Sequence, residues 1–77
     1  MRFDLKKAAR EAQIRSLENP FVREVAEYLL HHAHRLVTNK EIKKALNMSD
    51  THTSAALNGA ASRGVARKIG HGLWQAN

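Results

Sequence analysis

Apolar residues recur at three- and four-residue spacing along the N-terminal half of the chain, which predicts two helices. The first covers residues 3–17 and has a narrow apolar stripe made of Leu5, Ala8, Ala9 and Ala12. Asn19 and Pro20 are typical of an N-cap followed by the first helical residue. The helix that they begin should reach about residue 34, and its apolar face is the broadest in the sequence: Phe21, Val22, Val25, Ala26, Leu29 and Ala33. We expect this second helix to form the core.

A capping box begins the next predicted helix. The two apolar residues before it, Leu36 and Val37, are too few for a full β-strand, and we expect them to form a short bridge of extended chain. In Thr38-Asn39-Lys40-Glu41, the threonine hydroxyl can accept a hydrogen bond from the N–H of Glu41, whose carboxylate can reach back to the N–H of Thr38. We expect this helix to end near Asn47 and to bury Ile42, Ala45 and Leu46.

Another helix should follow after a turn of only a few residues. Its expected N-cap is Ser49 or Asp50, and it should extend to about Arg63, with Gly64 as its C-terminal stop. Two helices joined by such a short turn form a helix-turn-helix.

After Gly64 the periodicity changes from helical to extended. Residues 65–69 and 73–76 are predicted strands on either side of the tight turn Gly70-His71-Gly72. Trp74, on the return strand, is expected to pack across the hairpin onto the helices. The predicted fold class is therefore mostly α with a small β-hairpin.

The composition narrows the possible partners. A chain of 77 residues without cysteine allows one small domain and excludes disulfide frameworks and thiolate metal sites. The formal net charge is +6, and residues 38–77 hold six of the basic side chains but only two acids, Glu41 and Asp50. Such an excess of positive charge favours a polyanion, with nucleic acid first among the candidates. No segment is long and apolar enough for a membrane span, so we expect a cytoplasmic protein and no membrane partner.

Residues 20–77 resemble the winged helix-turn-helix family of DNA-binding domains. The resemblance is carried by the order of the elements and by the segments TNKEI, ALNGAASRGVARK and GHGLW. It implies a winged helix-turn-helix domain over residues 19–77, with residues 1–18 as an additional amphipathic helix. It also implies a DNA-binding transcriptional regulator, associated with the nucleoid, whose partner is double-stranded DNA.

On this resemblance, residues 49–63 are the recognition helix. At 100° per residue, one side should face the core through Thr53, Ala56, Leu57, Ala60 and Gly64. The opposite side carries Thr51, Ala55, Asn58, Gly59 and Ser62, with His52 at its edge. The expected base contacts are Thr51, His52, Asn58 and Ser62, because these side chains are small or form hydrogen bonds and an asparagine amide matches adenine. The competing interpretation is a solvated helix face.

Basic side chains flank this helix on both sides, and in the winged-helix family the corresponding regions meet phosphates. The expected phosphate contacts are Lys40, Lys43, Lys44, Arg63, Arg67, Lys68 and His71. The competing interpretation is ordinary solubilising charge.

The first helix, residues 3–17, has a stripe too narrow to be stable alone in water, so it must dock on something. It either forms a homodimer interface or packs on its own domain and completes the core. A third alternative, a basic amphipathic helix on a membrane surface, is weaker because Asp4 and Glu11 interrupt its positive charge. The first two alternatives remain open from the sequence.

Catalysis and metal binding have little support. Ser49, Asp50 and His52 are too close in sequence on one helix start to adopt the geometry of a hydrolytic triad. His31 and His34 share a face, but no carboxylate or cysteine accompanies them. We therefore expect no enzyme, no cofactor, no metal and no small-molecule substrate. The alternative function is a winged-helix module that binds another protein without sequence-specific DNA binding.

Overall fold

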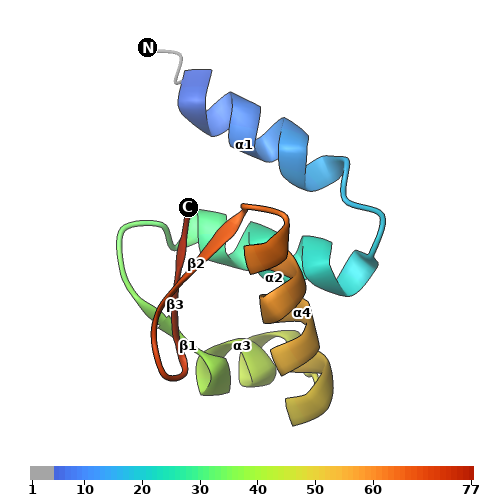
Figure 1. The fold of residues 1–77 in the computed structure, drawn as a ribbon, viewed down its shortest axis with the longest axis vertical. Helices are drawn as coiled ribbons and strands as arrows, with labels where there is room; N and C mark the ends of the chain where they lie inside the picture. Colours follow the sequence, from blue (N-terminus) through green and yellow to red (C-terminus); the bar gives the residue numbers. More distant parts are fainter. Residues whose placement is uncertain (1–4) are drawn as a thin grey trace.

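The computed structural model describes residues 5–77, and within them the chain forms helices that pack with one antiparallel sheet (Figure 1). The elements in chain order are α1 (Leu5–Arg15), α2 (Pro20–His31), β1 (Val37–Thr38), α3 (Asn39–Leu46), α4 (Asp50–Ser62), β2 (Ala66–Gly70) and β3 (Leu73–Ala76). The expected helix start at residue 3 and the expected burial of Leu5 lie outside what the structure describes. No helix within residues 5–77 is long and apolar enough to cross a membrane.

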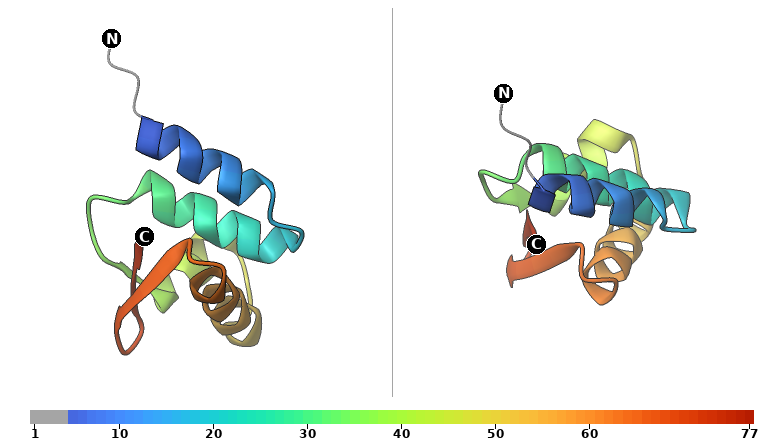
Figure 2. Two further views of the ribbon diagram at one scale, coloured as in Figure 1. Left: turned by 45° about the horizontal axis from the view of Figure 1, so that its top comes forward. Right: turned by 90° about the horizontal axis from the view of Figure 1, so that it is seen from above.

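Helix α2 is the central element, as predicted. In Figures 1 and 2 it lies between α1 on one side and α3, α4 and the sheet on the other. The side chain of Asn19 accepts hydrogen bonds from the N–H groups of the first turn, and Val25, Ala26 and Leu29 are completely buried. The prediction fails at the two ends of the apolar face. Phe21 is 46% exposed, and Ala33 is exposed because the helix ends at His31.

Helix α1 docks on its own domain, but mainly through residues outside the predicted stripe. Within the stripe Ala8 is partly buried and Ala9 and Ala12 are exposed, whereas Ile14 near the end of α1 and Leu17 just beyond it are buried in the core. Large aliphatic side chains gain more free energy from burial than alanine does, which explains why they set the rotation of the helix. The guanidinium of Arg10 also donates to the carbonyl of Gly64, after the end of α4.

These contacts fit the alternative in which the first helix packs on its own domain. A homodimer through residues 3–17 would have to use the face that carries Ala9 and Ala12, and it remains a prediction.

Helices α3 and α4 begin at the predicted caps. The hydroxyls of Thr38 and Ser49 each accept a hydrogen bond from the N–H three residues later, at 3.1 Å. Helix α3 ends at Leu46, its C-cap Asn47 adopts the left-handed conformation with φ 52°, and the chain then buries Met48. Ala45, expected in the core, is exposed.

The core side of α4 is as predicted. Its buried residues are Thr53, Ala56, Leu57 and Ala60, and Gly64 beyond its end has φ 78°.

The sheet has one more strand than the predicted hairpin. Val37 and Thr38 form β1, which pairs antiparallel with β3, so that the strand order is β1-β3-β2. Val37 is buried opposite Trp74, which is itself only 3% exposed. The expectation that Trp74 belongs to the core is therefore confirmed, and its indole N–H donates to the Oδ1 of Asn39.

Candidate nucleic-acid interface

Helix α4 carries a line of small, uncharged side chains on the side opposite its core residues. The line consists of Thr51, Ala55, Asn58 and Ser62, all exposed, and we refer to it as the α4 stripe. Successive members are separated by three or four residues, so they lie above one another on one face of the helix. Three of the four expected base contacts thus form one continuous surface.

Gly59 does not belong to this outward face, although the helical-wheel angle placed it there. It is partly buried against α2, and a Cβ atom added to it would lie 2.9 Å from Cγ2 of Val22. The absence of a side chain allows α2 and α4 to approach closely at this point.

His52, the fourth expected base contact, is held at the edge of the helix. Its ring stacks on Phe21 of α2, with ring centroids 5.3 Å apart and an interplanar angle of 14°. The apolar periodicity of residues 20–34 assigned Phe21 to the core and therefore missed this pair. His52 lies beside the α4 stripe rather than in it.

A hollow of about 180 Å³ separates α4 from the β2–β3 hairpin. Its wall includes Asn58 of the α4 stripe, Lys68 and His71 of the hairpin, and the indole of Trp74. Sequence reasoning missed two further members, Asn39 and Ser54. They come from separate helices, so no local pattern could have associated them. We call this cavity the hairpin hollow.

A second, more open groove lies on α3 and is lined by Lys40, Lys43, Lys44, Asn47 and Met48. The ammonium of Lys43 is 2.9 Å from a carboxylate oxygen of Asp50, which ties α3 to the start of α4. Lys40 and Lys44 are exposed and form no ion pair within the part of the chain that the structure describes. This groove, which we call the lysine groove, presents at least two available positive charges.

The remaining expected phosphate contacts lie apart from one another. Lys68 is opposite Trp74 in the sheet, and its ammonium is 5.9 Å from the centre of the indole ring. Arg67 pairs with Gln75, and because neighbouring residues of a strand alternate, it lies on the other face of the sheet. Arg63 follows the far end of α4, where it borders a groove that also contains Glu18.

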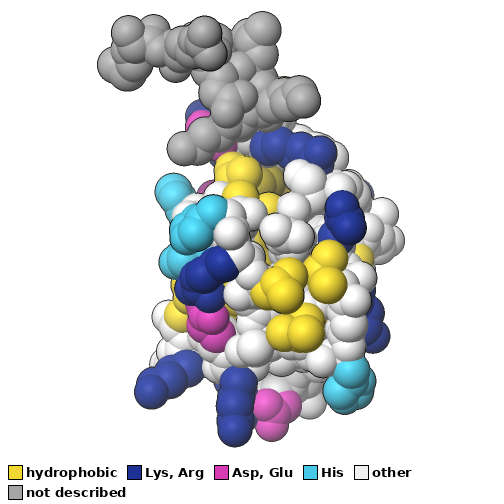
Figure 3. Space-filling view, turned by 90° about the vertical axis from the view of Figure 1, so that its left-hand side faces the viewer, with side chains coloured by type: hydrophobic (Ala, Val, Ile, Leu, Met, Phe, Trp, Pro, Cys, Tyr) yellow, Lys and Arg dark blue, Asp and Glu magenta, His cyan; other side chains and the backbone are white. Residues whose placement is uncertain are grey.

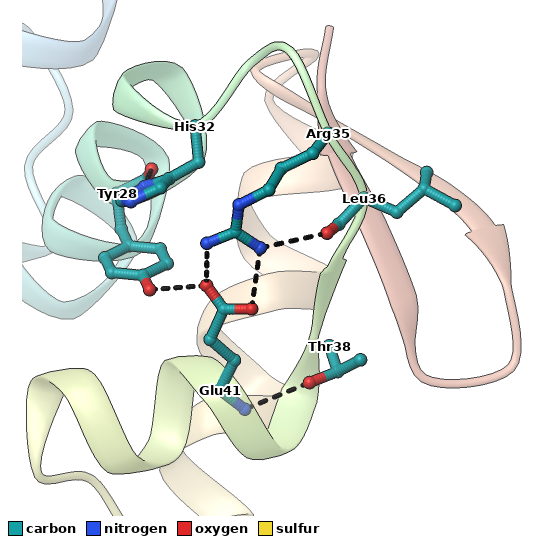
Figure 4. Close-up of polar contacts among 6 residues, drawn as sticks. All are labelled: Tyr28, His32, Arg35, Leu36, Thr38 and Glu41. Atoms are coloured by element: carbon teal, nitrogen blue, oxygen red, sulfur yellow. Dashed lines mark hydrogen bonds and ion pairs between the residues drawn. The ribbon is translucent and has the colours of Figure 1, made fainter.

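A network of polar side chains joins α2 to α3 (Figure 4). The expected return bond of the capping box is absent, because the carboxylate of Glu41 instead accepts two hydrogen bonds from the guanidinium of Arg35 and one from the hydroxyl of Tyr28. The charged, bidentate guanidinium is the stronger partner. The network fixes the start of α3 against the end of α2.

These hydrogen bonds change the pKa values of the groups involved. The bonds from Arg35, and secondly from Tyr28, lower the pKa of Glu41 from 4.5 to about 2. The bond that Tyr28 donates to Glu41, together with partial burial, raises the pKa of that phenol. At neutral pH the carboxylate of Glu41 is therefore charged, and it is already bound by Arg35 and Tyr28.

Both acids of residues 38–77 are consequently paired: Glu41 with Arg35, and Asp50 with Lys43. The other acids that the structure describes lie on α1, on α2 or between them: Glu11, Glu18, Glu24 and Glu27. Glu18, Glu24 and Glu27 form no ion pair among the described residues, whereas α3 and the hairpin carry lysines and no carboxylate outside an ion pair.

Hydrophobic side chains are exposed on another side of the molecule, which carries the sheet and the α2–β1 connection. In Figure 3, hydrophobic side chains gather in the middle of this face, and histidine, lysine and arginine side chains surround them. Leu36 and Ile69 are 45% and 41% exposed. Among the described residues, no group of three or more His, Asp or Glu side chains could hold a metal ion.

Comparisons of the chain with models of protein families, with curated proteins and with solved structures found no significant match. The function must therefore be inferred from the residues of the site and their arrangement.

Proposed function

We propose that this protein is a small winged helix-turn-helix DNA-binding protein that regulates transcription. Helices α3 and α4 are its helix-turn-helix, α4 enters the major groove, and the β2–β3 hairpin is the wing on the flanking backbone. The order of the elements and the strand order β1-β3-β2 are compatible with this fold. One observation carries the proposal: the uncharged α4 stripe shares the hairpin hollow with Lys68, and both carboxylates of residues 38–77 are already held in ion pairs.

The small side chains of the α4 stripe favour close approach to DNA. Thr51, Asn58 and Ser62 offer hydroxyl and amide groups that can meet base edges, and Ala55 allows the backbone of the helix to lie near the floor of the groove. Because the stripe has no charge of its own, most of the affinity must come from the flanking phosphate contacts. Such contacts make affinity fall with salt but carry no sequence information.

The distribution of charge supports this orientation of the complex. Helix α2 holds Glu24 and Glu27 against one arginine, Arg23, whereas α3 holds three lysines against Glu41, so α3 attracts phosphates more strongly than α2 does. Lys68 of the hairpin shares a hollow with Asn58 of α4, and Lys40 and Lys44 lie on α3, which packs against α4. These lysines favour an approach of the polyanion to α3, α4 and the hairpin.

An NMR titration tests both the binding and its orientation. The ¹⁵N-labelled protein is mixed at low salt with an unlabelled duplex of random sequence, and backbone amide shifts are followed. We expect the changes to lie on α3, the α4 stripe and the hairpin, with α1 and the acidic residues of α2 unaffected. Absence of any shift would contradict the proposal and favour the alternative, a module that binds another protein. Shifts concentrated on α1 and α2 would contradict the orientation.

A further inference from the structure

The hairpin hollow is lined by hydrogen-bond donors. The polar side chains around it are Asn39, Ser54, Asn58, Lys68 and His71, and no carboxylate is among the residues that line it. The amide oxygen of Asn39 already accepts the indole N–H of Trp74, so the NH₂ group of Asn39 is the part of the amide left for a ligand. The charge in the cavity is the ammonium of Lys68. A negatively charged acceptor satisfies the ammonium of Lys68 and the NH₂ group of Asn39 together, and the other polar side chains can donate to it as well.

The hollow is held in shape before any ligand arrives. The backbone N–H of Asn39 donates to the carbonyl of Gly72 at 3.2 Å, and its side chain holds Trp74. The first residue of α3 therefore fixes both the tip and the return strand of the hairpin. Lys68 lies across the strand pair from Trp74, with its ammonium over the indole ring. Asn39 does not have to be ordered upon binding, which lowers the entropic cost of holding a small anion.

The size and position of the hollow are compatible with a small anion. A cavity of about 180 Å³ accommodates one tetrahedral oxyanion. The hollow also lies directly beside the α4 stripe, because Asn58 belongs to both. The hydroxyl, amide and ammonium groups of serine, asparagine and lysine are the side-chain donors that commonly contact backbone phosphates.

We propose that the hairpin hollow binds one phosphate group of the DNA backbone and thereby sets the position of α4 in the groove. This inference rests on the proposed DNA-binding function and changes the role of one residue. Asn58, together with Ser54, holds the backbone instead of reading a base. Base contact is then left to Thr51 and Ser62, on either side of Asn58 in the α4 stripe.

The first experiment uses inorganic phosphate as the probe. The ¹⁵N-labelled protein is titrated with sodium phosphate, and sodium chloride of equal ionic strength serves as the reference. We expect saturable shifts of the side-chain NH₂ signals of Asn39 and Asn58 and of the Trp74 indole signal, with phosphate only. Equal shifts in both salts, or none, would overturn the site.

The second experiment asks whether the bound phosphate is that of DNA. Asn58→Asp places a carboxylate in the hollow without a change of shape, whereas Asn19→Asp makes the same chemical change at the N-cap of α2, where aspartate is equally suitable. We expect Asn58→Asp to weaken binding of a random-sequence duplex about tenfold more than Asn19→Asp does, because it replaces a charge-assisted bond with repulsion. Circular dichroism checks that both variants are folded.

The outcomes separate this inference from the proposed function. If the wild type binds the duplex and the two variants lose affinity equally, the hollow does not hold a backbone phosphate, although DNA binding stands. If phosphate shifts the signals of the hollow but the wild-type protein does not bind the duplex, the proposed function fails. The proposal that the bound phosphate belongs to DNA then fails as well. Selective phosphate shifts together with a selective loss in Asn58→Asp would support both.

Discussion

Replacement of Gly59 by alanine should force α2 and α4 apart. The new methyl group would lie 2.9 Å from Cγ2 of Val22, whereas carbon atoms in contact are normally about 3.5–4.0 Å apart. The atoms must therefore separate by roughly 0.6 Å or more. Valine in a helix has one strongly preferred rotamer, so its side chain cannot simply turn away. The strain must be relieved by movement of the helices.

Two opposing effects set the magnitude. Overpacking of a close helix contact costs about 1–3 kcal/mol. Alanine is a better helix former than glycine by about 1 kcal/mol, which offsets part of that cost. We therefore expect Gly59→Ala to destabilise the protein by about 0–2 kcal/mol in net. In a Val22→Ala background the clashing methyl is absent, and the same substitution should stabilise the protein by up to about 1 kcal/mol.

A double-mutant cycle measures this coupling. Urea unfolding of the wild type, Gly59→Ala, Val22→Ala and the double variant is followed by far-UV circular dichroism and by the fluorescence of Trp74. The two probes should report the same transition. If Gly59→Ala stabilises both backgrounds by the same amount, Gly59 faces open solvent and the close approach of α2 and α4 is wrong.

Three further perturbations test other parts of the structure. Glu41→Gln should lower stability at pH 7 by about 1 kcal/mol. Because the pKa of Glu41 is lower in the folded state, its contribution is present above pH 4.5 and is lost as the pH falls toward about 2. The variant should thus lose less stability than the wild type over that range in acid titrations, and equal slopes would contradict the network. Asn39→Ala should cost about 1–3 kcal/mol by leaving the buried indole N–H without its acceptor, whereas Asn39→Asp should retain most of the stability in urea unfolding. A similar loss in both Asn39 variants would argue against this hydrogen bond. Lys44→Gln should reduce the salt slope of DNA binding by about 0.9, and Arg15→Gln on α1, with the same change of charge, should leave it unchanged. If both variants reduce the salt slope equally, DNA binding depends on the net charge of the protein and not on the position of Lys44.

Local chemistry explains what could be predicted from the sequence. The caps at Asn19, Thr38 and Ser49 were predictable because each uses a side chain that bonds to N–H groups two or three residues later. The buried side of α4 was predictable because the helical period alone orders Thr53, Ala56, Leu57 and Ala60 on one face.

The features that could not be predicted from the sequence depend on tertiary contacts. Glu41 matches the capping-box pattern in the sequence, yet its carboxylate binds Arg35 and Tyr28 from outside the helix instead of the N–H of Thr38. Strand β1 exists only because β3, far along the chain, pairs with it. The hairpin hollow has the same origin, since Asn39 and Ser54 meet there only after α3, α4 and the hairpin have packed. Donors brought together in this way leave no periodic signal in the sequence.

The binding of random-sequence DNA at a series of salt concentrations tests the central claim most directly. A fluorescently labelled duplex is titrated with the wild-type protein, and anisotropy gives the association constant at each concentration. About four phosphate contacts by Lys40, Lys44, Lys68 and their neighbours predict that the logarithm of this constant falls with the logarithm of the salt concentration, with a slope of about −4. Flat binding, or no binding at the lowest salt, would contradict the proposal that this basic face binds DNA.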